Sequence, residues 1–181
     1  MSDKFFKLKI QKLLDRLPTP IKFNEAQWAM VYGLDENRFW VQIAARRTGK
    51  SYAAAILAFA KLLEPGQQVM VVAPNFSLSS IIWDYVTDLI KHLGVEVEKF
   101  NQKDKVVRLI NGSIFRLLSA NNRDSLIGRA ANLLIVDEAA VFLMMNILFV
   151  TYDRLFLPLK ILVAYGFQHL EEKVTTFITT I

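Results

Sequence analysis

Cysteine is absent from this sequence, and histidine occurs only twice. Without cysteine the chain can form neither disulfide bonds nor zinc sites with thiolate ligands. The two histidines, His92 and His169, are far apart in the sequence and do not have the spacing of a metal-binding motif. These absences exclude disulfide-stabilised domains and cysteine-based zinc domains.

Long apolar runs are also missing. The longest, residues 141–150, contains Asn146 and is too short to cross a bilayer. The N-terminal segment carries Asp3, Lys4 and Lys7, which is unlike a secretory signal. We therefore expect a soluble intracellular protein that does not associate with membranes.

The composition fits one domain with an anionic partner. The chain has 181 residues, of which 53% are hydrophobic, and this is enough for a sizeable core. Its 22 Lys and Arg residues against 17 Asp and Glu residues give a net charge of +5. A positive balance favours an anionic partner such as nucleic acid, but it does not indicate a site.

A phosphate-binding loop is the most informative motif. An apolar run at residues 39–43 leads towards Gly49, Lys50 and Ser51, and an alanine-rich helical stretch follows at residues 52–63. A strand, a tight loop and a helix with Gly-Lys-Ser at the junction form the layout of a P-loop. The N-terminus of such a helix has unpaired N–H groups and a partial positive charge, which attract phosphate.

This loop predicts an ATP site. Gly49 lets the backbone approach the phosphates, Lys50 reaches the β- and γ-phosphates, and the Ser51 hydroxyl is a ligand for Mg²⁺. The usual pattern begins with Gly, whereas this sequence has Ala44. A chance Gly-Lys-Ser is the alternative, and the flanking strand and helix argue against it. The residues expected to contact the nucleotide are Ala45, Arg46, Arg47, Thr48, Gly49, Lys50 and Ser51.

Gln27, upstream of the loop, has two interpretations. Asn24 is a good helix N-cap, and Gln27 follows it at the spacing of a capping box. Alternatively, the Gln27 amide binds the adenine of ATP, because it offers both a donor and an acceptor to N6–H and N7, as Gln does in DNA recognition. The sequence leaves both interpretations open. The helix that begins here is expected to end near Gly33.

The order of the apolar segments predicts an α/β fold. Continuous apolar runs at residues 69–73 and 133–136 are typical of strands covered on both faces. A helical pattern occupies residues 77–93, and Asn111-Gly112 between two extended runs predicts a β-hairpin. We predict a three-layer P-loop NTPase of the RecA-like type, with a mainly parallel sheet flanked by helices on both faces.

The N-terminal region is expected to form a separate helix. Residues 4–17 show a basic amphipathic pattern, and Pro18 and Pro20 then break the chain. This helix either packs on the domain or contacts DNA or a partner. We assign residues 1–20 to the N-terminal helix and linker, and residues 21–181 to the P-loop ATPase domain.

Two acids complete the predicted site. Asp137 and Glu138 follow the apolar run at residues 133–136, and functional residues in such sheets gather at the carboxyl ends of the strands. In a P-loop ATPase, Asp137 would hold Mg²⁺ together with Ser51, and Glu138 would orient and polarise the attacking water. The second acid points to hydrolysis of ATP rather than to phosphorylation of a small molecule.

Positive charge is needed where negative charge builds up on the γ-phosphate. Arg46 can supply it from within the loop, and we predict Arg46, Lys50 and Glu138 as catalytic residues. Arg123 and Arg129 precede the acidic strand and can act in the same chain or on a neighbouring subunit. Alternatively, these two arginines lie in a solvated loop or contact DNA phosphates. The sequence does not decide which arginine acts on the γ-phosphate.

These motifs resemble the N-terminal ATPase domain of the large terminase subunit of tailed bacteriophages, the motor that packages DNA into the prohead. The P-loop of that family often lacks the first Gly and carries an Arg four residues before the Lys, as with Ala44 and Arg46 here. Residues 134–140 are similar to the family's hydrophobic-Asp-Glu-Ala-Ala segment, and Gln27 falls on its adenine motif. The resemblance covers about residues 21–142.

A further loop, residues 125–129, resembles the family's Leu-Arg-Gly segment, but Ile127 stands where the family usually has Arg. The family also has a Thr- or Ser-rich coupling motif after the acidic strand. Thr179 and Thr180 are candidates for it, with an ordinary terminal strand as the alternative. Residues 143–167 are unusually apolar and match the family poorly.

The resemblance implies ATP hydrolysis that drives double-stranded viral DNA into a prohead. It implies the portal protein and the small terminase subunit as partners, a ring of identical subunits, and action in the host-cell cytoplasm. Full-length members also carry a nuclease with a cluster of acids. After Glu138 this sequence has only Asp153, Glu171 and Glu172, so we expect no nuclease activity from this chain.

Two other functions remain open. A helicase or another nucleic-acid-stimulated ATPase shares the upstream Gln, the P-loop and the Asp-Glu pair, but it needs a second RecA-like domain, for which 181 residues are too few. An inert module that binds nucleotide or DNA, and is inactive without partners, is the non-enzymatic alternative.

Overall fold

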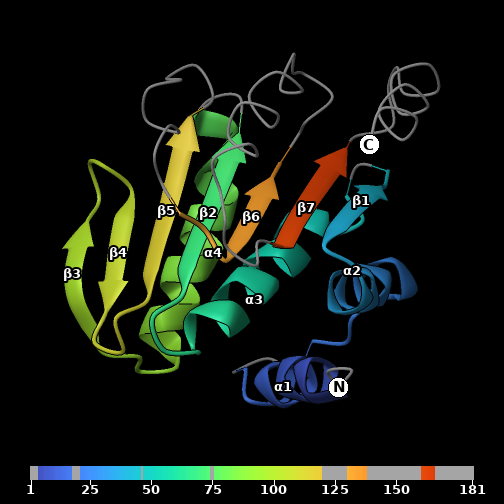
Figure 1. Ribbon diagram of the computed structural model, residues 1–181, viewed down its shortest axis with the longest axis horizontal. Coiled ribbons are helices and arrows are strands. Elements are labelled where there is room, and N and C mark those ends of the chain that lie inside the picture. Colours follow the sequence, from blue (N-terminus) through green and yellow to red (C-terminus); the bar gives the residue numbers. More distant parts are fainter. Residues whose placement is uncertain are drawn as a thin grey trace.

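A computed structural model describes residues 4–17, 21–45, 47–73, 76–119, 130–137 and 160–165. Four helices and seven strands lie in these ranges (Figure 1). The helices are α1 (Lys4–Asp15), α2 (Glu25–Glu36), α3 (Lys50–Leu62) and α4 (Phe76–His92). The strands are β1 (Phe39–Ile43), β2 (Gln68–Ala73), β3 (Val97–Asn101), β4 (Val106–Leu109), β5 (Ile114–Ser119), β6 (Leu133–Val136) and β7 (Lys160–Tyr165). No helix in these ranges is long and apolar enough to cross a membrane.

The strands form a single sheet in the order β1-β7-β6-β2-β5-β4-β3. β1, β7, β6, β2 and β5 are parallel to one another. β4 pairs antiparallel with both β5 and β3, so it alone among the seven described strands has the opposite direction. β1, β2 and β6 were predicted from apolar runs, and β5 as one arm of the hairpin. β2 and β6 are buried along almost their whole length, as strands covered on both faces should be. The prediction of a mainly parallel α/β sheet is confirmed.

β7 is the strand that the sequence did not reveal. It lies within residues 143–167, the apolar stretch that matches the family poorly, and it occupies the sheet between β1 and β6. Ile43 at the end of β1 is in register with Tyr165, and Val136 at the end of β6 is in register with Val163. The P-loop strand and the acidic strand are therefore separated by one strand rather than adjacent.

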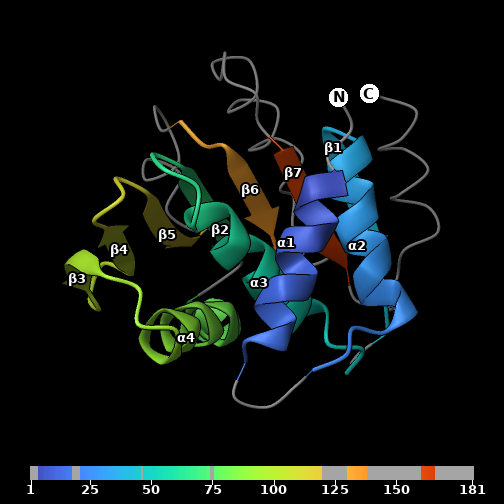
Figure 2. The same ribbon diagram turned by 90° about the horizontal axis from the view of Figure 1, so that it is seen from below.

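The described helices form one layer on one face of the sheet (Figures 1 and 2). α3 lies in the middle of this layer, where it contacts α1, α2 and α4 as well as β2 and β6. Every side chain from Ala53 to Ala60 is buried, and the five alanines in this stretch allow close packing on all sides. Within the described residues, the predicted helical cover is present on this face.

α2 continues beyond the predicted stop at Gly33 and ends three residues later. A Cβ atom at Gly33 would lie 2.1 Å from the ring of Trp40, so the glycine allows α2 to pack against the indole on β1. The Trp40 Nε1–H donates to Gln42 Oε1 at 3.1 Å, which fixes the ring in that position. Gly33 therefore serves packing between two elements rather than helix termination.

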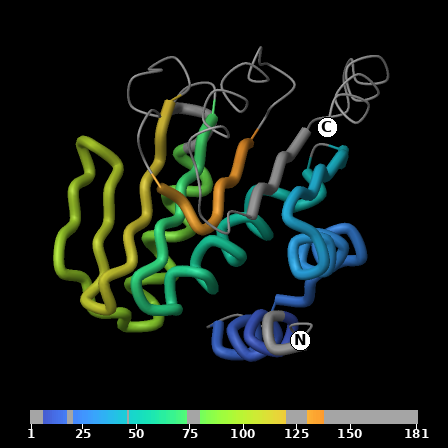
Figure 3. Tube along the Cα trace, viewed as in Figure 1, coloured from blue at the N-terminus to red at the C-terminus, as the bar shows by residue number. Residues whose placement is uncertain are grey.

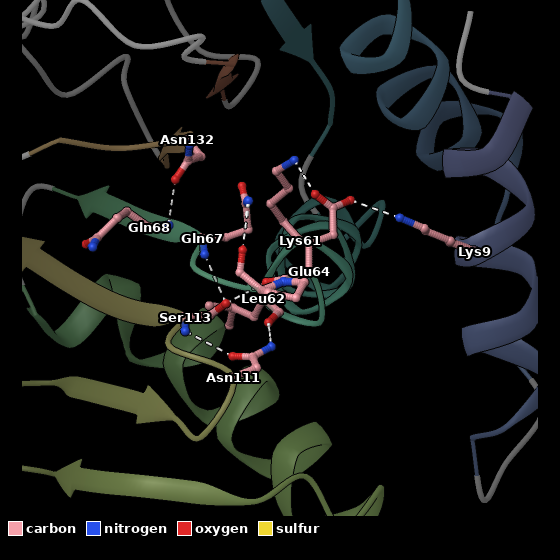
Figure 4. Close-up of polar contacts among 10 residues, drawn as sticks. Lys9, Lys61, Leu62, Glu64, Gln67, Gln68, Asn111, Ser113 and Asn132 are labelled. Atoms are coloured by element: carbon pink, nitrogen blue, oxygen red, sulfur yellow. Dashed lines mark hydrogen bonds and ion pairs between the residues drawn. The ribbon is translucent and has the colours of Figure 1, made fainter.

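The predicted hairpin is confirmed, and its turn also caps α3 (Figure 4). Gly112 has a φ of +83°, as the turn requires. The Asn111 side chain donates to the carbonyl of Leu62 at 2.9 Å, and the Ser113 hydroxyl donates to the carbonyl of Glu64 at 2.6 Å. The bond to Leu62 satisfies a carbonyl group that the end of the helix leaves without an intrahelical partner, and the bond to Glu64 holds the turn that follows α3.

α1 packs on the domain, which confirms the first of its two interpretations. Its apolar side chains Ile10, Leu13 and Leu14 are at most 5% exposed and belong to the same hydrophobic core as α2 and α3. The basic residues Lys12 and Arg16 of this region are exposed. The N-terminal helix is thus part of the core, although the proposed boundary near residue 20 stays a prediction.

Candidate nucleotide-binding site

The P-loop and the acidic strand meet at one edge of the sheet, where β1, β6 and β2 end (Figure 3). Extending the β6–β7 register by one residue places Asp137 level with Ala164, which pairs with Gln42 of β1. Two strand spacings separate these backbones, a distance of about 10 Å. Asp137 is also tied to β2, because its N–H donates to the carbonyl of Val72 at 2.9 Å.

The P-loop has a tightly curled backbone. Arg47 has a φ of +64° and Gly49 a φ of +77°, so two left-handed residues stand on either side of Thr48. The Thr48 hydroxyl donates to the carbonyl of Ala45 at 2.9 Å and closes the loop on itself. A left-handed residue followed by a helical one, as at Gly49 and Lys50, turns successive N–H groups towards one side, and such concavities bind anions.

The start of α2 is bonded to this loop. Asn24 and Gln27 form the predicted capping box: the Asn24 side chain accepts from Gln27 N–H at 2.9 Å, and Gln27 Oε1 accepts from Asn24 N–H at 2.9 Å. The two side-chain amides also reach the P-loop. Asn24 Nδ2 donates to the carbonyl of Thr48 at 3.1 Å, and Gln27 Nε2 donates to the carbonyl of Gly49 at 3.1 Å.

Two features favour glycine at position 49. Its left-handed φ is strained for residues with a side chain. A Cβ atom there would also lie 2.6 Å from Gln27 Nε2 and would displace the amide that anchors the loop. The same carbonyl of Gly49 accepts the first helical hydrogen bond of α3, from Ala53 N–H at 3.0 Å.

Lys50 and Asp137 are largely buried at this edge, with 9% and 3% of their surfaces exposed, and Ser51 is half-buried. No group of three or more His, Cys, Asp or Glu residues suited to a metal ion occurs among the described residues. The oxygen donors of Ser51 and Asp137 nevertheless fit Mg²⁺, which prefers oxygen ligands and is usually held by one or two carboxylates together with substrate phosphates and water.

Comparison with known proteins places this site in a family. A protein-family model, that of the helicase domain of the RNA cytidine acetyltransferase NAT10/TcmA, matches residues 41–157, which is more than half of the chain. The large terminase subunit of Escherichia phage T5 is 43% identical over 140 residues. The chain belongs to this helicase-domain family and to the large terminases of phages.

The alignment with the T5 terminase covers 76% of this chain but only 32% of the T5 protein. Two solved terminase structures share the fold. The large terminase of bacteriophage HK97 superposes with a TM-score of 0.73 at 15% identity, over 91% of this chain and 38% of that one. The large terminase of a thermophilic bacteriophage, in complex with ADP, gives a TM-score of 0.62 at 14% identity, over 80% of this chain and 39% of that one.

Part of the terminase site predicted from the sequence lies outside the described residues. This applies to Arg46, Glu138, Arg123, Arg129 and the candidate coupling residues Thr179 and Thr180. The segments that contain them follow strands that end at the P-loop edge or, for Arg46, belong to the loop itself. Their assigned roles therefore stay predictions.

Two features of this terminase site were not anticipated. The sequence reasoning treated Asn24 only as a helix cap, but its amide also holds the P-loop. The three-residue spacing of Asn24 and Gln27 was the available signal, because a capping box at the start of the preceding helix places two amides together. No local signal marked β7 as the strand between the P-loop and Asp137.

Proposed function

We propose that this chain binds and hydrolyses ATP as the motor domain of a DNA-packaging terminase. The observation that carries this proposal is the P-loop itself: a left-handed Gly49 at the start of α3, at the same sheet edge as the buried Asp137. A preformed concavity of N–H groups at a helix N-terminus selects phosphate. Large terminases of the same fold have been solved in complex with ADP and with ATP-gamma-S, which supports ATP as the nucleotide.

The proposed binding mode uses residues at both ends of the nucleotide. The N–H groups of residues 45–51 and the Lys50 ammonium would hold the β- and γ-phosphates. Gln27 would reach the adenine, and its present bond to the Gly49 carbonyl uses one of its two amide hydrogens, which leaves the other as a donor. Ser51 and Asp137 would hold Mg²⁺, which when bound neutralises charge on the phosphates.

Hydrolysis would then need a water molecule and a base. Glu138, the residue after Asp137, would accept hydrogen bonds from the water and take its proton as the water oxygen attacks the γ-phosphorus. The bond between that phosphorus and the bridging oxygen breaks, which releases phosphate and ADP. Arg46, with Arg123 or Arg129 as alternatives, would stabilise the charge that builds up on the transferred group.

Coupling of this reaction to double-stranded DNA is the second part of the proposal. The net charge of +5 suits contact with the DNA backbone without sequence preference. Assembly with a portal protein and a small terminase subunit, as a ring of identical subunits in the host-cell cytoplasm, is proposed by analogy with the family. The match to a helicase domain supports stimulation of the ATPase by nucleic acid, without distinguishing DNA from RNA.

The test is the Glu138→Gln variant. We expect its turnover of ATP to fall at least about a hundredfold, because the amide cannot accept the proton, while ATP affinity stays within about twofold. Glu98→Gln, on the exposed strand β3, is the matched control and should be as active as the parent. Undiminished hydrolysis by Glu138→Gln would contradict the proposal.

The dependence of the ATPase rate on protein concentration separates an active motor from an inert module. If catalytic sites are completed between subunits, the rate per chain should rise steeply with protein concentration and with added duplex DNA. Retained ATP binding with no hydrolysis at any concentration, and with DNA and Mg²⁺ present, would instead show a binding module. An active chain that unwinds duplex DNA would favour the helicase alternative.

A further inference from the structure

A second site lies at the far end of α3 from the P-loop. α3 begins in the P-loop and runs for 13 residues, or about 20 Å. Around its C-terminal end, α1 lies on one side and the end of α4 on the other (Figure 2). Residues of these three helices line an open groove of about 660 Å³.

The floor of this groove is apolar. Phe59 and Leu63 of the α3 end line it, together with Leu93 and Val95 from the chain that leaves α4. Leu63 is 46% exposed, although it sits among apolar neighbours. Apolar side chains along the C-terminal turns of a helix, between two flanking helices, form the kind of surface into which a further helix can pack.

The α1 wall of the groove is positively charged. Lys9, Lys12 and Arg16 line it, and the only acid in the lining is Glu64. Glu64 is already bound by Lys61 at 2.6 Å and by Lys9 at 3.0 Å (Figure 4). Lys12 and Arg16 are exposed and make no ion pair with any described residue. The wall therefore offers two uncompensated cations beside the apolar floor.

We propose that this groove binds an acidic amphipathic helix of a partner protein. Leucine-like side chains at successive turns of that helix would contact Leu63 and Leu93, and its Asp or Glu side chains would face Lys12 and Arg16. Nucleic acid fits less well, because a phosphate backbone gains nothing from an apolar floor. The groove is separate from the nucleotide site and adds a protein-docking surface to the domain.

The proposal can be tested with a designed probe. The probe is a fluorescein-labelled helical peptide of about sixteen residues, with Leu at helical spacing on one face and Glu on the other. A peptide of the same composition with its leucines scattered serves as the comparison. Fluorescence anisotropy with the full chain should show saturable binding of the amphipathic peptide, at least about tenfold tighter than of the scattered one.

Charge reversal locates the site. Lys12→Glu with Arg16→Glu should weaken the binding of the amphipathic peptide about tenfold. Lys99→Glu with Lys103→Glu, on the exposed β3–β4 hairpin, makes the same change in net charge away from the groove and should leave binding within about twofold. Leu63→Ser, which alters an exposed side chain of the floor, should also weaken binding. Circular dichroism melting curves confirm that each variant is folded.

Three results would overturn the proposal. The first is equal affinity for the two peptides. The second is an equal loss of binding in the two charge-reversal variants, which would indicate attraction by net charge alone. The third is displacement of the peptide by a short DNA duplex whose own binding is lost in Lys12→Glu with Arg16→Glu, which would assign the groove to nucleic acid.

Discussion

Single residues at the P-loop carry more than one task. Asn24 caps α2 with its side-chain oxygen and holds the Thr48 carbonyl with its side-chain nitrogen. The Gln27 side chain likewise accepts from Asn24 N–H with its oxygen and donates to the Gly49 carbonyl with its nitrogen. Two amides from the start of the preceding helix thus hold the conformation of the loop, and this arrangement would preorganise the proposed phosphate site before nucleotide binds.

A pair of substitutions separates the two tasks of Asn24. Asn24→Asp keeps an oxygen that accepts from Gln27 N–H but cannot donate to the Thr48 carbonyl, so it should weaken ATP binding with little loss of stability. Asn24→Ala loses both bonds, and the missing cap should cost about 1 kcal/mol. Urea unfolding and nucleotide titration measure the two effects. Equal ATP affinity of Asn24→Asp and the parent would show that the bond to Thr48 does not shape the site.

At the scale of elements, close packing and capping decide where helices and strands end. α2 passes through Gly33 because the missing side chain lets the helix lie against Trp40 of β1. The turn of the β4–β5 hairpin caps α3 through Asn111 and holds the turn after α3 through Ser113. The first contact joins two consecutive elements, and the second joins the end of α3 to residues 49 positions further along the chain. The position of the loop between β1 and α3 depends on both.

Gly33→Ala tests the contact between α2 and β1. The added Cβ would overlap the Trp40 ring, and displacing the ring should destabilise the fold by about 1–3 kcal/mol, despite the higher helix propensity of alanine. The double variant Gly33→Ala with Trp40→Leu should recover part of this loss in urea unfolding. A single variant as stable as the parent would mean that the ring moves at no cost.

At the scale of the whole molecule, one ion-pair cluster ties the N-terminal helix to the domain. Glu64 follows α3 and binds both Lys61 and Lys9, which belongs to α1 (Figure 4). Burial alone would raise the pKa of Glu64, but the hydrogen bonds and charges of Lys61 and Lys9 outweigh burial and lower the pKa below its ordinary value of 4.5.

This shift predicts a pH dependence of stability. Because the folded-state pKa lies below the unfolded value, the Glu64 cluster stabilises the fold above pH 4.5 and loses this contribution as the pH falls through the folded-state pKa. The contribution should be below about 1 kcal/mol, since Lys9 is half exposed. Glu64→Gln should flatten this part of the unfolding profile, measured in urea from neutral pH to pH 3, whereas Glu98→Gln should not. Identical profiles would exclude the cluster as the cause.

Local chemistry let the sequence alone determine much of this protein. The P-loop layout, the capping box at Asn24, the β4–β5 hairpin and the strand before Asp137 all follow from residues that are neighbours in the chain. Hydrophobic continuity and turn residues act over a few positions, so these elements were predictable from their own segments. Of these motifs, the P-loop and the acidic strand also carried the resemblance to the terminases, together with Gln27 and the loop at residues 125–129.

Only the tertiary structure decided what depends on distant residues. β7 takes its place between β1 and β6 because both neighbours offer free strand edges, and nothing in its own apolar sequence specifies that order. The bond from Asn24 to the Thr48 carbonyl joins residues 24 positions apart, and the groove beside Leu63 exists only because α1 and α4 both flank α3. Contacts of this kind are set by packing in space, which a local pattern does not encode.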